Sequence, residues 1–188
     1  MPVIADVSLH VRPLVVVSGL PASGKSTAGR AVAEALSLPL FDKDEILEAL
    51  FESLGGGDAE WRFRQSRAAD HVLRALVGAS SGGVVVSWWK HPRTTTRSGT
   101  ETAWLLSLPE KIVELHCTCS PEVAVNRFFA RQRHLGHLDA EKSASAELEK
   151  FRLLAALGPL EVGPLVVCNT ELPTDGHAIA RALREITG

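Results

Sequence analysis

The feature that most constrains this chain is a short apolar run that leads directly into a glycine-rich segment. Leu14–Val17 is continuously apolar and mostly β-branched, which is typical of a buried parallel strand. The next segment, Gly19–Ser26, fits the pattern G-x-x-x-x-G-K-[ST] at every fixed position. An alanine-rich segment, Ser26–Leu36, follows and predicts a helix. A strand, a glycine loop and a helix in this order predict a site that binds phosphate groups.

Each residue type in this loop suits the binding of a nucleotide. Glycine lets the backbone turn its N–H groups toward an anion, and the start of the following helix adds its positive dipole end. Lys25 supplies a mobile positive charge for the β- and γ-phosphates, and the Ser26 hydroxyl can bind Mg²⁺. We therefore expect ATP and Mg²⁺ as cofactors, since a chance glycine turn leaves the flanking strand and helix unexplained. The residues expected to contact the nucleotide are Gly19, Leu20, Pro21, Ala22, Ser23, Gly24, Lys25, Ser26 and Thr27.

Strand-like and helix-like segments alternate along the rest of the chain. The predicted strands are Leu14–Val17, Pro39–Phe41, Gly83–Ser87, Ile112–Cys119 and Leu165–Cys168. The predicted helices are Ser26–Leu36, Glu45–Leu54, Ala59–Leu76, Pro121–Arg131, Ala146–Leu157 and Asp175–Ile186. This alternation predicts an α/β fold, a three-layer sandwich with helices on both faces of a five-stranded parallel sheet. The 188 residues suit one domain, residues 1–188, in which residues 1–12 form a loosely attached leader.

Composition narrows the classes of partner that the chain suits. The formal net charge is −2 and the isoelectric point about 6.4, so we expect no nucleic-acid partner, because such proteins carry a basic excess. No apolar run approaches the ~20 residues of a membrane span and no signal peptide is evident, so we expect no membrane association and a cytoplasmic location. The cysteines are Cys117, Cys119 and Cys168, and their spacing favours buried thiols over disulfides or a zinc site.

A cluster of carboxylates follows the second predicted strand. Asp42 and Asp44 stand at its end, and ligands of parallel sheets gather at the carboxyl ends of strands. A carboxylate there can accept the proton of a hydroxyl group that attacks a phosphate. The alternative is that Asp44 caps the next helix, and both roles are compatible. From the residues alone, either aspartate could serve as the base or lie beside Mg²⁺.

Residues 19–27 and 41–46 together resemble the small-molecule and polynucleotide kinase branch of the P-loop NTPases. The first segment is a Walker A loop and the second reads Phe-Asp-Lys-Asp-Glu-Ile. The branch includes chloramphenicol phosphotransferase, zeta toxins, gluconate kinases and the kinase domain of phage polynucleotide kinase. The resemblance covers roughly residues 14–175, and only its Walker A loop is highly specific. It implies that Asp44 is the general base and that Asp42 lies at the magnesium side.

Three arginines follow the fourth predicted strand. Arg127 and Arg131 share a helix face at i,i+4 spacing, and Arg133 comes soon after. A solvated basic face is the alternative. The resemblance implies that Arg127 approaches the adenine, that Arg131 stabilises the transferred charge, and that residues 132–145 form a lid with a hinge near Gly136. The histidines of this segment match no zinc spacing.

The end of the third predicted strand departs from the common pattern. Many P-loop NTPases have an aspartate there that holds Mg²⁺ through water, whereas this chain has Ser87. A serine is also tolerated in gluconate kinases. Trp88 and Trp89 follow, and they are expected either to wall an acceptor pocket or to pack in the core. His116 lies inside a predicted strand and is expected to be structural.

These observations predict an ATP-dependent phosphotransferase that moves the γ-phosphate to a hydroxyl of a small molecule. Its catalytic residues are expected to be Lys25, Asp44 and Arg131, and Ser26 and Asp42 are expected to hold the metal. Acceptors of the right class are an antibiotic, a sugar or sugar acid, or a nucleoside. The alternatives are a polynucleotide 5′-hydroxyl kinase and a nucleotide-binding switch with low turnover.

Overall fold

A computed structural model describes residues 12–139 and 142–187, and it contains a five-stranded parallel sheet. The strands are β1 (Leu14–Gly19), β2 (Leu40–Asp42), β3 (Gly83–Val86), β4 (Ile112–Thr118) and β5 (Leu165–Asn169), in the spatial order β2-β3-β1-β4-β5. The helices are α1 (Lys25–Leu36), α2 (Lys43–Leu54), α3 (Ala59–Gly78), α4 (Pro121–Ala130), α5 (Ala144–Ala155) and α6 (Gly176–Thr187), with short 3-10 helices at Ala103–Ser107 and Leu135–His137. The predicted fold class is thus confirmed. The predicted leader lies outside the described residues, except for Arg12.

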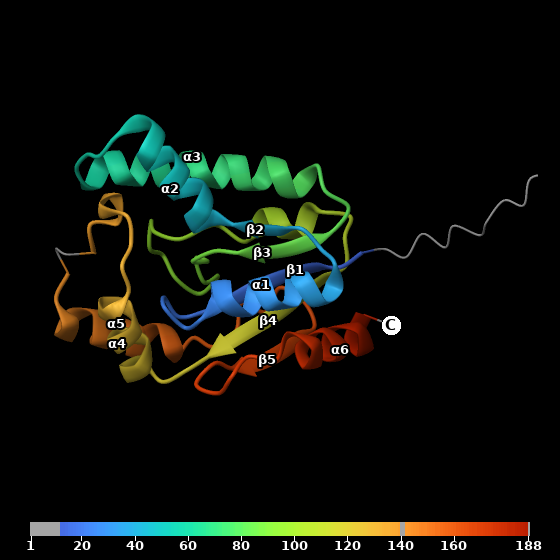
Figure 1. The fold of residues 1–188 in the computed structure, drawn as a ribbon. Coiled ribbons are helices and arrows are strands. Elements are labelled where there is room, and N and C mark those ends of the chain that lie inside the picture. Colours follow the sequence, from blue (N-terminus) through green and yellow to red (C-terminus); the bar gives the residue numbers. More distant parts are fainter. Residues whose placement is uncertain (1–11, 140–141, 188) are drawn as a thin grey trace, which may run out of the picture.

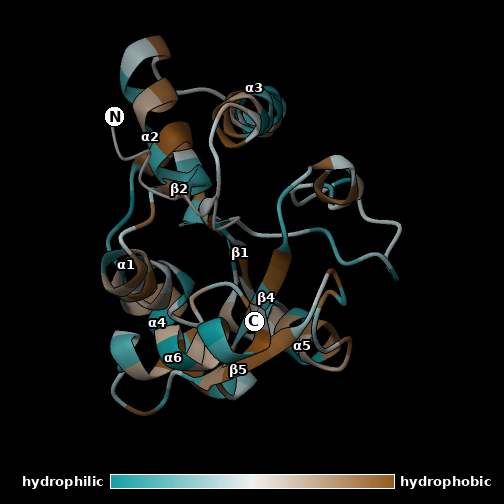
Figure 2. Cartoon of the chain, turned by 90° about the vertical axis from the view of Figure 1, so that its right-hand side faces the viewer, coloured by the Kyte–Doolittle hydropathy of each residue, from teal (hydrophilic) through white to brown (hydrophobic). Residues whose placement is uncertain are grey.

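The central strand β1 packs helices against both of its faces because its side chains alternate. Val15 and Val17 belong to the core under α1 and α6. Leu14 and Val16 point the other way, into the core formed with α3 and the 3-10 helix Ala103–Ser107. Figure 2 shows α1 and α6 on one side of the strands and α5 on the other. Two buried layers on one sheet make the three-layer arrangement that alternation of elements predicted.

The carboxyl ends of the strands meet at one end of the molecule, on the left in Figure 1. The chain leaves β1 for β2 and β3 on one side and then crosses to β4 and β5 on the other. Sheets of this kind bind ligands beyond the carboxyl ends, where the chain changes sides. The turn after β1, the start of α2 and the segment between α4 and α5 all lie at this end (Figure 1). The fold therefore brings the expected site residues to one place.

Helix boundaries differ from the predicted ones where a side chain caps a helix earlier than expected. Helix α2 begins at Lys43 because Asp42 is its N-cap and accepts a hydrogen bond from the Asp44 backbone N–H. The suggestion that Asp44 caps this helix is therefore wrong. Helix α5 begins at Ala144, two residues before the predicted start, because the Ser143 side chain caps it.

The described part of the chain contains no helix that is long and apolar enough to cross a membrane.

Candidate active site

The loop between β1 and α1 has the backbone shape of an anion cradle. Gly19 has φ 130° and Gly24 has φ 84°, values at which glycine avoids strain. A Cβ on Gly19 would lie 2.2 Å from the Cys117 carbonyl oxygen, so any other residue would clash with β4. Inside the loop, the Ser23 Oγ is buried and has no hydrogen-bond partner among the residues that the structure describes. Buried polar groups rarely stay unpaired, so this loop has donors left for a phosphate group.

Lys25 lies over the loop whose anion it is expected to bind. Its Nζ donates to the carbonyl oxygens of Gly19, at 3.1 Å, and Leu20, at 2.5 Å. Burial lowers the pKa of Lys25 to about 8, against the attraction of nearby acidic groups such as Asp44. The hydrogen-bond acceptors of this ammonium group are neutral carbonyl oxygens, so a negatively charged phosphate group would stabilise its positive charge strongly. The structure thus fits the role expected of Lys25.

Two oxygen ligands for a metal ion stand side by side at the start of α1 and α2. The Ser26 Oγ donates to the Asp42 carboxylate at 2.6 Å, and burial raises the pKa of Asp42. A hydroxyl and a carboxylate are the kind of oxygen ligands that Mg²⁺ prefers. The described residues contain no group of three or more His, Cys, Asp or Glu side chains placed to hold a metal. The residues therefore fit an ion that is held by these two groups together with nucleotide oxygens and water.

Asp44, the expected base, lies half-exposed on the first turn of α2. Its carboxylate forms an ion pair with Arg133, at 2.5 Å, from the segment after α4. The Arg133 guanidinium also contacts Asp139, at 3.4 Å. Arg133 was given no role from the sequence. Its position beside Asp44 is visible only in the folded structure, since Asp44 and Arg133 are 89 residues apart along the chain.

The expected arginines Arg127 and Arg131 both line a cavity of about 290 Å³ above the loop, which we call the phosphate cavity. Arg127 holds α4 against the end of β5, because its Nη2 donates to the Thr170 carbonyl oxygen at 2.8 Å. Thr170 in turn donates its hydroxyl to the Ser23 carbonyl at 2.6 Å, which ties β5 to the loop. Arg131 lies one residue beyond α4 and leaves its buried Nε unpaired. Two of the arginines predicted from spacing thus face one cavity.

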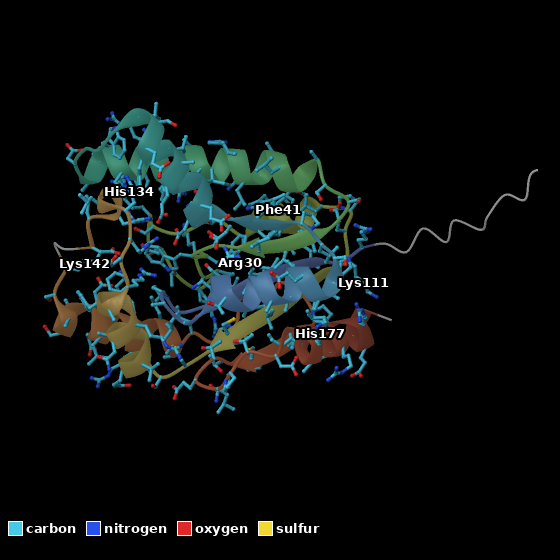
Figure 3. All side chains as sticks on the ribbon, in the orientation of Figure 1. Arg30, Phe41, Lys111, His134, Lys142 and His177 are labelled. Carbon is cyan, nitrogen blue, oxygen red and sulfur yellow. The ribbon has the colours of Figure 1, made fainter. Side chains whose placement is uncertain are left out.

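Positive charge dominates the phosphate cavity. Besides the two arginines and Lys25, it is lined by Arg62, Arg133, Lys142 and Lys150, against the acidic residues Asp44 and Glu147. Within the described part of the chain, the buried Nε of Arg62 has no hydrogen-bond partner. Figure 3 shows Lys142 at the end of the molecule where the α4–α5 segment lies. The cavity has more positive groups than one triphosphate needs, and unused donors remain within it.

The two adjacent tryptophans have different environments. Trp89 is 6% exposed, packs in the core and donates its Nε1 to the Val17 carbonyl at 2.9 Å. Trp88 lines the phosphate cavity, and the Lys150 ammonium lies over its ring, 5.1 Å from the ring centre. Core packing is thus confirmed for Trp89, whereas a role of Trp88 in an acceptor pocket stays a prediction. Ser87 shares a hydrogen bond of 2.6 Å with the Thr100 hydroxyl.

A buried ion pair anchors the turn that carries both aspartates. Lys43 points away from the cavity into the space between α2 and α3, where its Nζ lies 2.7 Å from the Asp70 carboxylate. Both side chains are almost completely buried. The Thr100 hydroxyl also donates to Asp70, at 2.7 Å. Lys43 was overlooked in the sequence because a lysine between two aspartates suggests a solvent-exposed turn.

The predicted lid segment packs against α2 in this structure. Gly136 lies on Phe51, and a Cβ there would come within 2.6 Å of that ring. His137 is 1% exposed and its Nε2 lies 2.8 Å from the Glu48 carboxylate. The absence of a side chain at Gly136 is therefore required by packing, which is a different reason from the expected hinge. Residues 140–141 of the predicted lid lie outside the described residues.

A parallel sheet whose central strand leads into an anion cradle and a helix defines a P-loop nucleotide-binding protein. Comparison with known proteins agrees. The chain matches the model of a family described as an AAA domain over residues 14–154 and belongs to that family.

Individual relatives are kinases by description. The chain is 44% identical over 81 residues to the shikimate kinase of Corynebacterium glutamicum, a match that covers 39% of this chain and 43% of that protein. It is 35% identical over 107 residues to the shikimate kinase of Paracidovorax citrulli, covering 50% and 56%. The matches thus span about half the length of these curated relatives. A crystal structure from Chloroflexus aurantiacus, itself only provisionally assigned as a kinase, has a TM-score of 0.76 and 31% identity and covers 94% of this chain and 98% of that one.

Proposed function

We propose that this protein is a small-molecule kinase that transfers the γ-phosphate of ATP to a hydroxyl group. The observation that carries the proposal is that Lys25 and Asp44, from two different elements, line the same cavity. A phosphate-binding cation and a carboxylate facing one space are what transfer to an alcohol requires. A nucleotide-binding switch needs no carboxylate on the acceptor side.

The residues around the loop divide the work of binding. The loop N–H groups and Lys25 bind the phosphates, and Arg127 holds the nucleoside side near Thr170. Ser26 and Asp42 hold Mg²⁺, which would neutralise charge on the phosphate oxygens when bound. Arg131 stabilises the charge of the group in transfer, because it lines the phosphate cavity and its buried Nε has no hydrogen-bond partner among the described residues. Residues 132–145 act as a lid.

Asp44 receives the proton of the acceptor hydroxyl. In the structure, Arg133 occupies one of its carboxylate oxygens, so the acceptor must bind to the other oxygen or displace the arginine. When the acceptor displaces Arg133, that guanidinium becomes free to bind an anionic group.

The acceptor is therefore proposed to be a small hydroxylated compound, with hydroxylated acids first among the candidates. Arg62 and Arg133 both line the phosphate cavity beside Asp44. Guanidinium groups suit carboxylates because they can bind both oxygens. The curated relatives that carry the name shikimate kinase support the same choice. Neither alternative drawn from the sequence gains comparable support. A net charge of −2 does not favour a polynucleotide, and a switch needs no carboxylate beside the phosphate-binding lysine.

The test is a screen of hydroxylated compounds for ATP-dependent phosphorylation, followed by Asp44→Asn. This substitution keeps the shape of the side chain and removes the base. The transfer rate should fall by about 10²–10⁴-fold, while ATP affinity measured by calorimetry stays unchanged. Loss of both together would assign Asp44 to the metal site and make Asp42 the base. Efficient 5′-phosphorylation of short single-stranded DNA, included in the same screen, would contradict the proposal.

A further inference from the structure

A second cavity lies on the other side of the phosphate loop, and no role has been assigned to it. It measures about 200 Å³ and lies beyond the carboxyl ends of β1 and β4, against the end of α5. Its apolar walls include Leu20, Leu154, Leu157 and Leu160. Pro21 and Trp88 line both this cavity and the phosphate cavity. A molecule reaching past these two residues would therefore occupy both spaces.

The polar side of this cavity is formed by Ser18 and His116, which are linked to the buried Glu114 behind them. Ser18 and His116 are neighbours in the register of β1 and β4, and the Ser18 Oγ lies 2.7 Å from the His116 Nδ1. The same Oγ lies 2.5 Å from a carboxylate oxygen of Glu114, which is completely buried. Glu114 also accepts the backbone N–H groups of Leu160 and Glu161, at 2.8 and 2.9 Å. Its carboxylate is thus held by three donors.

This series of hydrogen bonds determines which ring nitrogen of His116 carries the proton. A carboxylate only accepts hydrogen bonds, and a serine hydroxyl has a single hydrogen to donate. Ser18 donates that hydrogen to Glu114, so its oxygen must accept from His116, and the proton of the ring stands on Nδ1. Burial lowers the pKa of His116 against the attraction of Glu114, and this direction favours the neutral ring. The Nε2 is therefore a hydrogen-bond acceptor, and it has no bond to any residue that the structure describes.

The other imidazole of the cavity is already satisfied. The Nε2 of His91 lies 2.9 Å from the Pro159 carbonyl oxygen, to which it must donate. Its Nδ1 accepts the backbone N–H of Arg93 at 3.2 Å. The cavity thus offers a ligand one free imidazole acceptor, from His116, within apolar walls.

Size and chemistry together define what fits. An apolar cavity of about 150 Å³ holds benzene, so this one has room for a substituted six-membered ring. Leucine and tryptophan walls favour an apolar ring over a charged group. A ring with an O–H or N–H group would pair with His116, whereas a ring without a donor would leave that nitrogen unpaired.

We propose that this cavity binds the ring of the acceptor, through an O–H or N–H group that donates to the His116 Nε2, while a hydroxyl of the same molecule reaches Asp44 past Trp88. Calling the bound molecule the acceptor rests on the proposed kinase function. Binding of a ring in this cavity can be tested without that function. It narrows the acceptor to alcohols with a donor-bearing ring and a reacting hydroxyl placed far enough from that donor to reach Asp44, because β4 and β2 lie three strands apart in the sheet.

The first experiment measures binding of phenol and toluene, which match in shape and differ in the donor, by ligand-observed NMR. Phenol should bind about tenfold more tightly than toluene, because toluene leaves a buried acceptor unpaired. Hydrophobicity alone would reverse this order, and His116→Phe should reverse it too. Ala155→Trp, at an exposed position that lines the cavity, should weaken binding of both without touching the hydrogen bonds of His116. Equal binding of the pair, or no binding of either, would overturn the ring site.

The second experiment connects the cavity to transfer. Among compounds that the screen finds to be phosphorylated, ring alcohols with a second donor should lose about tenfold in kcat/KM in His116→Phe, with the KM for ATP unchanged. Phosphorylation of acyclic compounds only, at rates that His116→Phe does not change, would overturn the proposal and leave the kinase function intact. If phenol binds as expected and Asp44→Asn retains that binding, failure to find any phosphorylated compound would count against the kinase function and not against the ring site.

Discussion

The sequence motif predicts the position of Lys25, but the pKa of its side chain depends on its surroundings in the folded protein. The sequence predicts a lysine for the phosphates, but its burial against carbonyl oxygens sets its pKa near 8. Free lysine titrates near 10.4, so this side chain loses its charge within an accessible pH range. The pH dependence of nucleotide affinity should therefore report the charge state of Lys25.

ATP affinity should weaken as pH rises through the pKa of Lys25. If only the charged form binds phosphate, the charged fraction falls from about three quarters at pH 7.5 to about one tenth at pH 9, for a pKa of about 8. The apparent Kd for ATP should accordingly rise about eightfold over that range, measured by calorimetry at constant ionic strength. Lys25→Arg keeps its charge at both values of pH, so its affinity, although weaker, should be independent of pH. An equal slope in both proteins would show that another group titrates.

At the scale of elements, the turn between β2 and α2 is held by a residue between the two aspartates. Lys43 connects this turn to α3 through Asp70, and Asp70 also binds Arg67, at 2.8 Å. Burial lowers the pKa of Lys43, since the ammonium has left water. Removing one partner of a buried pair leaves an uncompensated charge, which is far more destabilising than losing an exposed pair.

Asp70→Asn should lower the free energy of unfolding by about 3–5 kcal/mol, measured by urea denaturation. The matched control is Glu45→Gln, which breaks the pair between α1 and α2 formed with Arg30 at 2.7 Å. Both of those side chains are more than half exposed, so this change should be no larger than about 1 kcal/mol. The double substitution Lys43→Met with Asp70→Leu should recover most of the loss. Similar effects for Asp70→Asn and Glu45→Gln would show that the buried pair is not structurally important.

At the scale of the whole molecule, the phosphate loop connects elements from both halves of the sheet. Gly19 approaches the Cys117 carbonyl of β4, and Thr170 after β5 bonds the loop at Ser23. The phosphate cavity adds side chains from α2, α3 and the α4–α5 segment. A nucleotide in that cavity would therefore contact elements that span most of the chain, and it should stabilise the fold as a unit.

Saturation with MgATP should raise the melting temperature. At about 100 times its Kd, a ligand that binds only the folded state adds about 2.7 kcal/mol, which for a chain of this size corresponds to a shift of about 5–10 °C. Scanning fluorimetry of the tryptophans would measure it. Lys25→Ala should melt at a similar temperature without nucleotide and lose most of the shift. A full shift in that variant would contradict the placing of ATP on the loop.

Prediction from the sequence succeeded where a feature is local. Apolar strands that alternate with helical segments led to the parallel sheet, and the cysteines are free, with burial raising the pKa of Cys117 to about 12. Element bounds were off by up to two residues where caps such as Asp42 and Ser143 decide them. The roles given to Asp44, Arg127 and Arg131 remain predictions, as does the cytoplasmic location. The alternation of side chains along β4 contained a further signal that was overlooked. Glu114 and His116 are two residues apart in this strand, so their side chains lie on the same face of the sheet.

By itself, the sequence determined the fold class and the phosphate loop, because patterns of residues close along the chain predict both. Glycine conformations, a helix start and the period of apolar residues are read directly from neighbours. Only the tertiary structure decided that Arg133 lies on Asp44 and that Ser18 links His116 to Glu114. It also decided that Trp88 lines both cavities, whereas Trp89 packs in the core and lines only the second one. Ser18 and Glu114 are 96 residues apart, and contacts at such separations arise from the packing of whole elements. Partners of this kind have no pattern in a single sequence, and they decide which chemical groups the site presents to a ligand.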